Sequence, residues 1–346
     1  MRRGSRKSSN GRGKENMDIR TTIIIPNYNG LKFMEPCLQS LQEQTKADFK
    51  LLIVDNGSTD GSVEWLKERK LPAILLSENT GFAGAVNVGI QAADTPYVIL
   101  LNNDTTVDPC YVEHMERAMD QSEKIFSVSS KMVQMACPTL MDDAGDMYSI
   151  LGWAYQRGVG RSVKRYTRPC RVFTACAGAA IYRREVFEKI GYFDELHFAY
   201  LEDIDVGYRA KLYGYDNIYC PDAVVYHVGS GTSAEGSRYS DFKVRLASRN
   251  GIYLNYKNMR AWQLLLNGPF LLLGIFIKYL FFVKRGFGKA YVSGLSEGIR
   301  TAGSCSRVPG FQGRFQQELK VQLELYAGTC IYVYEFLRRQ MAKIKA

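Results

Sequence analysis

The first hundred residues alternate between short apolar runs and stretches with helical spacing. The apolar runs, each predicted to be a buried strand, are residues 21–25, 49–54, 73–76 and 98–101. Between them, apolar residues recur at intervals of three and four, as in Met34, Cys37, Leu38 and Leu41, which is typical of a helix packed on one face. Strands alternating with helices predict right-handed crossovers and a parallel sheet. We therefore expect an α/β fold with a mostly parallel sheet flanked by helices.

Each predicted strand ends in a polar or glycine-rich loop. These loops are residues 26–30, 55–61, 78–84 and 102–104. Because the carboxyl ends of parallel strands share one edge of the sheet, the loops would converge where open α/β sheets hold ligands. Asn, Asp and Gly are also common turn residues. Their recurrence after every strand nevertheless favours a site for a nucleotide diphosphate over purely structural turns.

The loop after the fourth strand carries candidate metal chemistry. Asn102, Asn103 and Asp104 follow the continuous apolar run 98–101, so carboxylate and amide oxygens emerge together from a buried strand. Such oxygens suit a hard divalent cation, and such a cation suits a diphosphate. An Asx-rich turn without function is the alternative interpretation.

Charge and cysteine content narrow the class of protein. The formal net charge of +10 over 346 residues suits anionic partners: nucleotide sugars, lipid phosphates or nucleic acid. Residues 1–18 are rich in Arg, Lys, Ser and Gly, and we expect a disordered basic tail without the apolar core of a signal peptide. The eight cysteines are scattered, which favours reduced cytosolic thiols over a disulfide framework or a zinc site.

The C-terminal region is predicted to be helical and associated with a membrane. Residues 262–283 are apolar enough to cross a bilayer, but Gln263, Asn267, Lys278 and a break at Gly268-Pro269 interrupt them. A helix lying in the cytoplasmic leaflet, against an anionic membrane surface, fits this pattern better than a spanning helix or a buried core helix. A second helical stretch, residues 319–344, is expected to dock on the first or to mediate a homo-oligomer.

Four ordered motifs stand at the ends of the predicted strands. They are Ile25-Pro26-Asn27-Tyr28-Asn29-Gly30, Val54-Asp55-Asn56-Gly57-Ser58-Thr59-Asp60-Gly61, Glu78-Asn79-Thr80-Gly81-Phe82-Ala83 and Leu100-Leu101-Asn102-Asn103-Asp104-Thr105. Together they resemble the family 2 glycosyltransferases, most closely the rhamnosyltransferase-like branch of bacterial cell-surface polysaccharide synthesis. The resemblance covers roughly residues 21–257. It implies a GT-A fold, a dTDP- or UDP-linked sugar donor, a divalent metal (Mn²⁺ or Mg²⁺) and inversion at the anomeric carbon.

This resemblance also divides the chain and assigns its binding residues. The glycosyltransferase domain would span residues 19–258, with a nucleotide-binding half at 19–108 and an acceptor half at 109–258, before a membrane-associated region at 259–346. The Asp55 carboxylate would accept a hydrogen bond from the imide of uracil or thymine. Trp153 and Gly178 would face the acceptor, with core packing as the alternative for Trp153. The donor-binding residues implied are Pro26, Asn27, Tyr28, Asn29, Asp55, Gly57, Asn79, Gly81, Phe82, Asn87, Asn102, Asn103 and Arg249.

The metal ligands and the catalytic base are likewise carried over from the family. Asn102 replaces the first acid of the family's Asp-x-Asp motif, which leaves Asp104 as the direct metal ligand. His227, at the end of another predicted strand, matches the family's metal-binding histidine, and the loop 229–233 would close over the diphosphate. Asp203 matches the base that takes the acceptor's proton, and Glu202 would orient it. A helix dipole also favours acids at this position without any function.

These assignments predict a metal-dependent inverting glycosyltransferase that adds one sugar, rhamnose or a hexose, to a lipid-linked or polysaccharide acceptor. No nucleic-acid partner is expected. Processive synthases are disfavoured because their Gln-x-x-Arg-Trp motif is absent. A nucleotidyltransferase would show a basic, glycine-rich loop after the first strand, where Asn27-Tyr28-Asn29 stands instead. A catalytically silent membrane scaffold remains the alternative from a different class, although the presence of Asp104, Asp203 and His227 argues against it.

Overall fold

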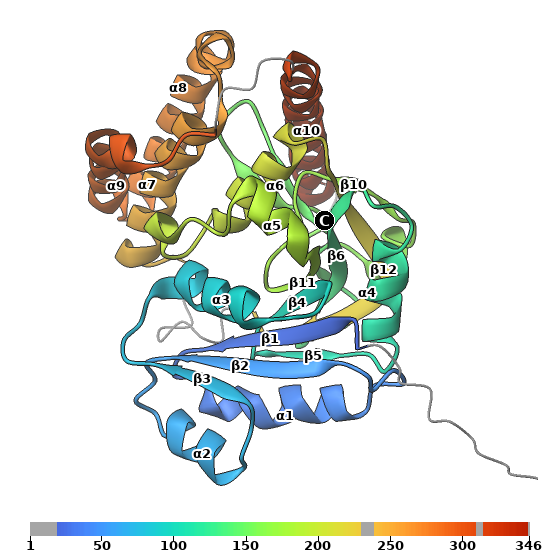
Figure 1. The fold of residues 1–346 in the computed structure, drawn as a ribbon. Coiled ribbons are helices and arrows are strands. Elements are labelled where there is room, and N and C mark those ends of the chain that lie inside the picture. The colour runs from blue at the N-terminus through green and yellow to red at the C-terminus, as the bar shows by residue number, and fades with distance from the viewer. Residues whose placement is uncertain (1–18, 230–238, 309–313, 345–346) are drawn as a thin grey trace, which may run out of the picture.

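The computed structural model describes residues 19–229, 239–308 and 314–344 (Figure 1). The predicted basic tail and most of the predicted loop 229–233 lie outside these residues. The strands are β1 (Thr21–Asn27), β2 (Lys50–Asn56), β3 (Ala73–Leu76), β4 (Tyr97–Leu101), β5 (Thr105–Val107), β6 (Ile125–Gln134), β7 (Met141–Asp143), β8 (Asp146–Tyr148), β9 (Ala154–Gln156), β10 (Cys170–Val172), β11 (Ala179–Arg183) and β12 (Asp216–His227). The helices are α1 (Leu31–Gln42), α2 (Ser62–Glu68), α3 (Gly81–Ala92), α4 (Tyr111–Met119), α5 (Arg184–Ile190), α6 (Glu202–Leu212), α7 (Asp241–Asn258), α8 (Ala261–Lys284), α9 (Gly288–Thr301) and α10 (Phe315–Ile344).

The main sheet is mixed, and the part built from the N-terminal strands β1 to β4 is parallel. Its strands run in the order β10-β12-β6-β11-β4-β1-β2-β3. β1 is parallel to both β2 and β4, and β2 is parallel to β3. β11 is antiparallel to its neighbours β4 and β6, so its first residue, Ala179, pairs with Leu101 at the end of β4. This pairing brings the segment before β11 to the polar loop after β4.

The two faces of the sheet carry separate helical layers. Ile23 and Ile25 of β1 pack on the face covered by α1 and α4, whereas Ile24 packs on the face covered by α3, α5 and α6. This alternation follows from the two-residue period of a strand. The isoleucines are fully buried, so the sheet edge that carries the loops is held rigidly between the two layers.

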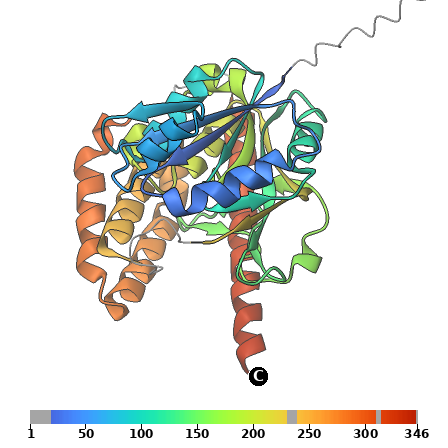
Figure 2. The same cartoon turned by 90° about the horizontal axis from the view of Figure 1, so that it is seen from below.

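The C-terminal helices lie on the side of the molecule away from β1–β3 (Figures 1 and 2). α8 is continuous through Pro269, so the predicted break at Gly268-Pro269 is wrong. Gln263 and Asn267, which we expected to interrupt an apolar surface, are buried and hydrogen-bonded to Glu318 and Gln322 of α10. Only 11% of the apolar window of α8 is buried, which excludes the alternative of a core helix.

Candidate active site

A pocket of about 250 Å³ opens at the carboxyl ends of β1, β2 and β4. This volume is slightly below the usual range for small-molecule sites, about 300–1,000 Å³. Phe198, Ala199 and Tyr200, which the sequence did not predict, form its opposite wall. The predicted donor-binding residues that line the pocket are Pro26, Asn27, Tyr28, Asn79, Gly81, Phe82, Asn102 and Asn103.

A chain of hydrogen bonds fixes the floor of this pocket. Asn103 Nδ2 donates to Asn27 Oδ1 at 2.7 Å, and Asn27 Nδ2 donates to Asp55 Oδ2 at 2.8 Å. The other Asp55 oxygen accepts from the backbone N–H of Ser58 at 3.0 Å. Asp55 is therefore fully buried with both oxygens in use. It orients Asn27 and, through Asn27, Asn103; the contact of Asp55 with the base stays a prediction.

Two glycines allow backbone segments to approach each other closely around the pocket. Gly81 has φ +78°, and a Cβ there would lie 2.4 Å from the carbonyl oxygen of Phe198. Gly57 has φ +76°, and a Cβ there would lie 2.8 Å from the backbone of Glu78. Only glycine readily combines a positive φ with such proximity. Gly57 and Asn29 were both predicted to bind the donor, but neither lines the pocket. They support its loops instead: Gly57 lets two backbone segments approach each other, and Asn29 Oδ1 accepts from the Thr59 N–H at 2.7 Å.

Two predicted donor-binding residues are located elsewhere, which corrects the sequence analysis. Asn87 is buried, and its Nδ2 donates to the Phe193 carbonyl at 2.8 Å. Arg249 pairs with Glu297 of α9 at 3.1 Å and donates to the Leu196 carbonyl at 2.8 Å. Both side chains hold the segment before α6 against the neighbouring helices, and neither lines the pocket.

Asp104 and His227 meet because β5 pairs with β12. Thr105 and His227 are directly opposite in this antiparallel pair, which places Asp104 Oδ1 at 3.4 Å from His227 Nε2. Asp104 is 3% exposed, and its Oδ1 has no hydrogen-bond partner among the described residues. His227 Nδ1 lies 2.7 Å from Asp142 Oδ2.

This arrangement fits a divalent cation. A histidine that ligates through Nε2 usually donates its Nδ1 hydrogen to a carboxylate, and Asp142 is placed to receive it. The unpartnered Asp104 oxygen supplies the hard ligand that Mn²⁺ or Mg²⁺ prefers. Burial alone would lower the pKa of His227, but the carboxylates of Asp104 and Asp142 outweigh burial and raise it to about 10. Without a metal, the imidazolium therefore balances the two carboxylates.

Asp203 belongs to a second acidic cluster that adjoins the first through Asp143: besides burial, the charges of Asp142 and Asp203 both raise the pKa of Asp143. Asp203 Oδ1 accepts from the Ile204 N–H at 2.7 Å in the first turn of α6. Burial raises the pKa of Asp203, although hydrogen bonds from Ile204, Ala177 and Asp146 counteract it. A carboxylate with a raised pKa is better matched to abstracting a proton near neutral pH. The neighbouring Glu202 is buried, and its Oε2 has no partner within the described part of the chain; burial raises its pKa well above the usual range.

Asp143, Asp146 and Cys176 complete this second cluster. Their potential ligand atoms lie within 4.8 Å of one another. A buried thiol is a poor partner for a hard cation, and burial raises the pKa of Cys176 well above its usual range. Burial, followed by the charges of Asp143 and Asp203, also raises the pKa of Asp146. We therefore interpret the cluster as acids that share protons with Asp203.

Gly178 contacts Asn102, which lines the pocket. Its carbonyl accepts from the Asn102 N–H at 2.8 Å, and a Cβ on it would lie 3.0 Å from Asn102 Nδ2. Trp153, the other acceptor candidate, donates from Nε1 to the Gly274 carbonyl of α8 at 3.1 Å and packs against Tyr332 of α10. Trp153 therefore faces the C-terminal helices.

The segment before α6 is strained and held from α7. Phe198, Tyr200 and Leu201 have φ between 62° and 72°, which is unfavourable for residues other than glycine. Asn250 Nδ2 donates to the carbonyls of His197, Ala199 and Tyr200 at 2.8–2.9 Å. Asn250 thus fixes the segment that forms one pocket wall and leads into Glu202 and Asp203.

Sequence reasoning missed the roles of Asp142 and Asn250. The acid-rich run around residues 142–146 was a visible signal, but nothing local in it indicates that Asp142 reaches His227. The hydrogen bonds of Asn250 likewise depend on the packing of α7 against a distant segment.

Comparison with known proteins agrees with this geometry. Residues 22–191 match the family model described as glycosyl transferase family 2. A Mycobacterium tuberculosis N-acetylglucosaminyl-diphospho-decaprenol L-rhamnosyltransferase is 28% identical over 233 residues, which cover 59% of this chain and 75% of the relative. A Staphylococcus epidermidis teichoic acid poly(glycerol phosphate) polymerase is 37% identical over 89 residues, 24% of this chain and only 12% of that protein.

The fold has a solved counterpart. The crystal structure of GalNAc-T7 with UDP, GalNAc and Mn²⁺ superposes with a TM-score of 0.59 at 17% identity, covering 85% of this chain and 56% of that one. At this identity the likeness concerns the fold, which is that of a GT-A glycosyltransferase. Together with the family match, it confirms the resemblance found in the sequence motifs: residues 22–191 form a family 2 glycosyltransferase domain.

Proposed function

We propose that this enzyme is a metal-dependent inverting glycosyltransferase that moves one sugar, rhamnose or a hexose, from a dTDP- or UDP-linked donor to a lipid-linked or polysaccharide acceptor. One arrangement carries the proposal: Asp104 Oδ1, which has no hydrogen-bond partner among the described residues, faces His227 beside the pocket of about 250 Å³, and the Asp203 carboxylate with its raised pKa lies in the adjoining cluster. GalNAc-T7, which shares the fold, holds UDP and Mn²⁺. The rhamnosyltransferase relative is named for a decaprenyl-diphosphate-linked acceptor.

In the proposed reaction, Asp203 acts as the general base. The acceptor hydroxyl attacks the anomeric carbon while its proton passes to an Asp203 oxygen, and the bond between that carbon and the diphosphate oxygen breaks. The diphosphate leaves from the opposite face, so the anomeric configuration inverts. A divalent cation bound by Asp104 and His227 would offset the charge on the leaving diphosphate.

The pocket residues would orient the donor for this attack. Tyr28 is 45% exposed at the pocket rim and offers an aromatic face for the base. Asn102 and Asn103 would contact the diphosphate from the end of β4. The Asn27–Asp55 hydrogen bond keeps these groups in place before the donor arrives, which reduces the entropy lost on binding.

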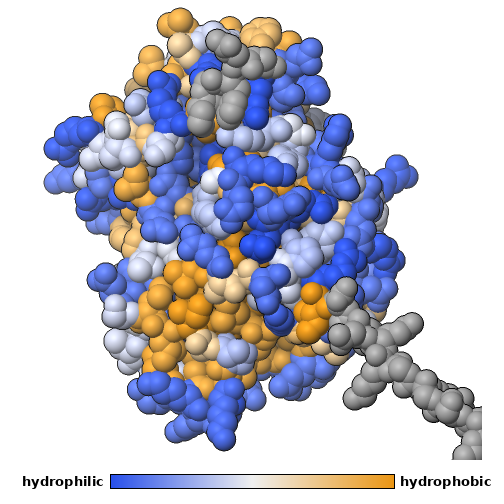
Figure 3. Space-filling model, in the orientation of Figure 1, coloured by the Kyte–Doolittle hydropathy of each residue, from blue (hydrophilic) through white to orange (hydrophobic). Residues whose placement is uncertain are grey.

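The proposal includes attachment to the cytoplasmic face of the cell membrane. Supporting it, α8 has its polar side chains buried against the protein and its apolar side chains outward, the reverse of a soluble surface helix. Leu265 and Leu272 are 81% and 69% exposed. Apolar residues gather over α8 at the top of Figure 3. α8 is long and apolar enough to span a bilayer, but its buried face contacts α10, which fits a helix lying in the interface.

A thermal-shift screen of nucleotide sugars with Mn²⁺ or Mg²⁺ tests the donor and metal assignments. We expect a dTDP- or UDP-sugar to raise Tm only when a divalent cation is present, and Asp104→Asn to abolish the dependence on the cation. Equal shifts with and without metal in both proteins would contradict the metal-dependent reaction.

A further inference from the structure

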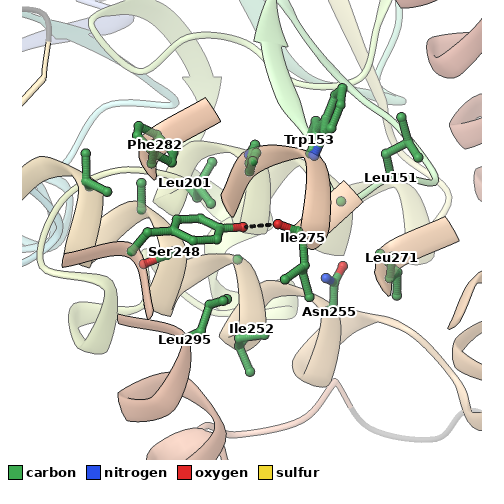
Figure 4. A pocket seen from close by; sticks show the side chains of 16 residues that line it. Leu151, Trp153, Leu201, Ser248, Ile252, Asn255, Leu271, Ile275, Phe282 and Leu295 are labelled. Atoms are coloured by element: carbon green, nitrogen blue, oxygen red, sulfur yellow. Dashed lines mark hydrogen bonds between the residues drawn. The ribbon is translucent and has the colours of Figure 1, made fainter. Parts of the chain in front are cut away.

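A second cavity, of about 80 Å³, lies between α7, α8, α9 and the turn at residues 149–153 (Figure 4). Its walls are mostly apolar: Trp153, Leu201, Ile252, Ile275, Phe282 and Leu295. Leu201 directly precedes Glu202 and Asp203, so the cavity lies next to the turn that carries the proposed base. Nothing in the proposed donor chemistry uses it.

The cavity is formed by fixed contacts of the α8 backbone. A Cβ on Gly274 would lie 2.1 Å from the Leu151 carbonyl oxygen, so only glycine lets α8 approach the 149–153 turn this closely. Trp153 Nε1 then donates to the Gly274 carbonyl, and the Tyr291 hydroxyl of α9 donates to the Ile275 carbonyl at 3.4 Å, the bond dashed in Figure 4. These bonds hold three sides of the cavity open in a defined shape.

Lys278 is the charged side chain of this otherwise uncharged lining. Its Nζ lies 5.9 Å from the centre of the Trp153 ring. Within residues 19–229, 239–308 and 314–344, no carboxylate influences its protonation, and burial lowers the pKa of Lys278 to about 8. An ammonium group in an apolar cavity without a counter-ion is unfavourable. An anionic ligand group would supply that counter-ion.

The surface next to Lys278 indicates what the anionic group is attached to. Leu272, Phe276 and Ile277 of α8 are 69%, 57% and 41% exposed, and they flank the residues that line the cavity. A ligand that joins an anionic group to a long hydrocarbon chain would match both features. The cavity of about 80 Å³ has room for little more than a phosphate group, so the hydrocarbon chain would lie at its rim and along α8.

We propose that this cavity binds the lipid phosphate of the acceptor, with Lys278 as counter-ion and the first isoprenoid carbons against Trp153, Ile275 and Phe282. This inference rests on the proposed function, because it names the carrier on which the accepting sugar is held. Since Leu201 links the cavity wall to the α6 turn, a lipid phosphate bound here would present its attached sugar towards Asp203.

Binding of farnesyl phosphate to the full chain in detergent micelles, measured by calorimetry, tests the inference. We expect Lys278→Met to weaken this binding at least about tenfold, towards the affinity for farnesol, which lacks the phosphate. Lys278→Arg retains the charge and should bind farnesyl phosphate nearly as well as the wild type. The matched control, Lys284→Met, removes an exposed lysine at the end of the same helix and should have no effect.

Several outcomes would overturn the inference. Equal farnesyl phosphate affinity in the wild type and Lys278→Met would exclude Lys278 as the counter-ion. Displacement by equimolar dioleoylphosphatidylglycerol, or binding of inorganic phosphate as strong as that of farnesyl phosphate, would show a site for a different anion. Lys278→Met removes a half-buried charge, so an unchanged or higher Tm checks that it folds.

Failure of the proposed function is distinguishable from failure of this inference. Lys278-dependent binding of farnesyl phosphate in a wild-type chain that binds no nucleotide sugar would contradict the proposed function alone. Donor turnover by the wild type, together with Lys278-independent binding, would contradict the inference alone.

Discussion

Asp104, Asp142 and His227 show how individual side chains acquire a function from their surroundings. Among the described residues, Asp104 Oδ1 is buried with no hydrogen-bond partner and lies 3.4 Å from His227 Nε2; a buried carboxylate is stable only when paired with a cation or hydrogen-bond donors. When His227 is protonated, its imidazolium is the cation that faces Asp104. When His227 is neutral, Nε2 has a lone pair that can ligate a metal beside Asp104. Asp142 stabilises both forms of His227, because it accepts the Nδ1 hydrogen in each.

We predict that Asp142→Asn weakens Mn²⁺ binding about 10- to 100-fold, as is typical for groups that orient a metal-ligating histidine. The amide is neutral and does not polarise the imidazole as a carboxylate does. Titration of free Mn²⁺ by electron paramagnetic resonance measures the change. His114→Ala is the matched control, because His114 bonds to the Asp222 carbonyl outside the cluster. Equal losses in both variants would rule out a specific role for Asp142.

The pH dependence of transfer should report the pKa of Asp203. Because this pKa is raised and the base acts only when deprotonated, kcat/KM should fall as pH decreases through a value above the usual range of an aspartate. Asp146 donates a hydrogen bond that lowers the pKa of Asp203. Asp146→Ala should therefore shift the acid limb to higher pH, whereas Asp146→Asn, which keeps a donor, should shift it less. A limb that does not move in Asp146→Ala would contradict this coupling.

For single residues, the location in the fold could be predicted from the sequence only where the residue lies at the end of a predicted strand. Asp104 and His227 directly follow or end predicted strands, so their location at the sheet edge could be predicted. Asn87 and Arg249 lie on helices, and their partners, Phe193 and Glu297, are distant in sequence. No local pattern reveals such a partner, so both were wrongly assigned to the donor.

Among the elements, α7 has a structural role in the active site. The side chain of Asn250 donates hydrogen bonds to three backbone carbonyls in the strained segment before α6, those of His197, Ala199 and Tyr200. The segment's left-handed residues are unfavourable by about 1–3 kcal/mol each, and these bonds offset part of that strain. The pocket wall at Phe198–Tyr200 therefore depends on a helix that does not line the donor pocket.

We predict that Asn250→Ala raises the KM for the donor more than it lowers kcat, because the pocket wall loosens while Asp203 stays in α6. Loss of the hydrogen bonds should also lower the free energy of unfolding by about 1–3 kcal/mol. Steady-state kinetics and urea unfolding measure the two effects. Asp241→Ala, at the exposed start of the same helix, should change neither. A pure decrease in kcat would argue against a positioning role.

The elements themselves were predictable where one period dominates the sequence. The four N-terminal strands and the helices between them follow the expected order. The antiparallel direction of β11 depends on its pairing with both β4 and β6, which no local sequence pattern reveals. Gln263 and Asn267 of α8 were expected to interrupt its apolar surface. They face α10, which sequence periodicity alone does not reveal.

At the scale of the whole molecule, the C-terminal helices present an apolar surface on one side. We predict that Leu265→Asp combined with Leu272→Asp releases the protein from anionic vesicles of phosphatidylglycerol and phosphatidylcholine. Both side chains are exposed, so the substitutions remove lipid contact without disturbing the core. Flotation with the vesicles measures the effect, and Leu75→Asp, an exposed leucine on β3, is the control. Flotation of the double variant equal to that of wild type would contradict the membrane assignment.

The account as a whole rests on the gathering of Asp104, His227 and Asp203 around one reaction centre. Single-turnover sugar transfer by Asp203→Asn tests it most directly, with donor and Mn²⁺ affinities measured on the same protein. We predict that the rate of transfer falls about 10²- to 10⁴-fold, while the affinities for donor and Mn²⁺ stay within about twofold of wild type. Transfer at the wild-type rate would contradict the assignment of Asp203 as the base.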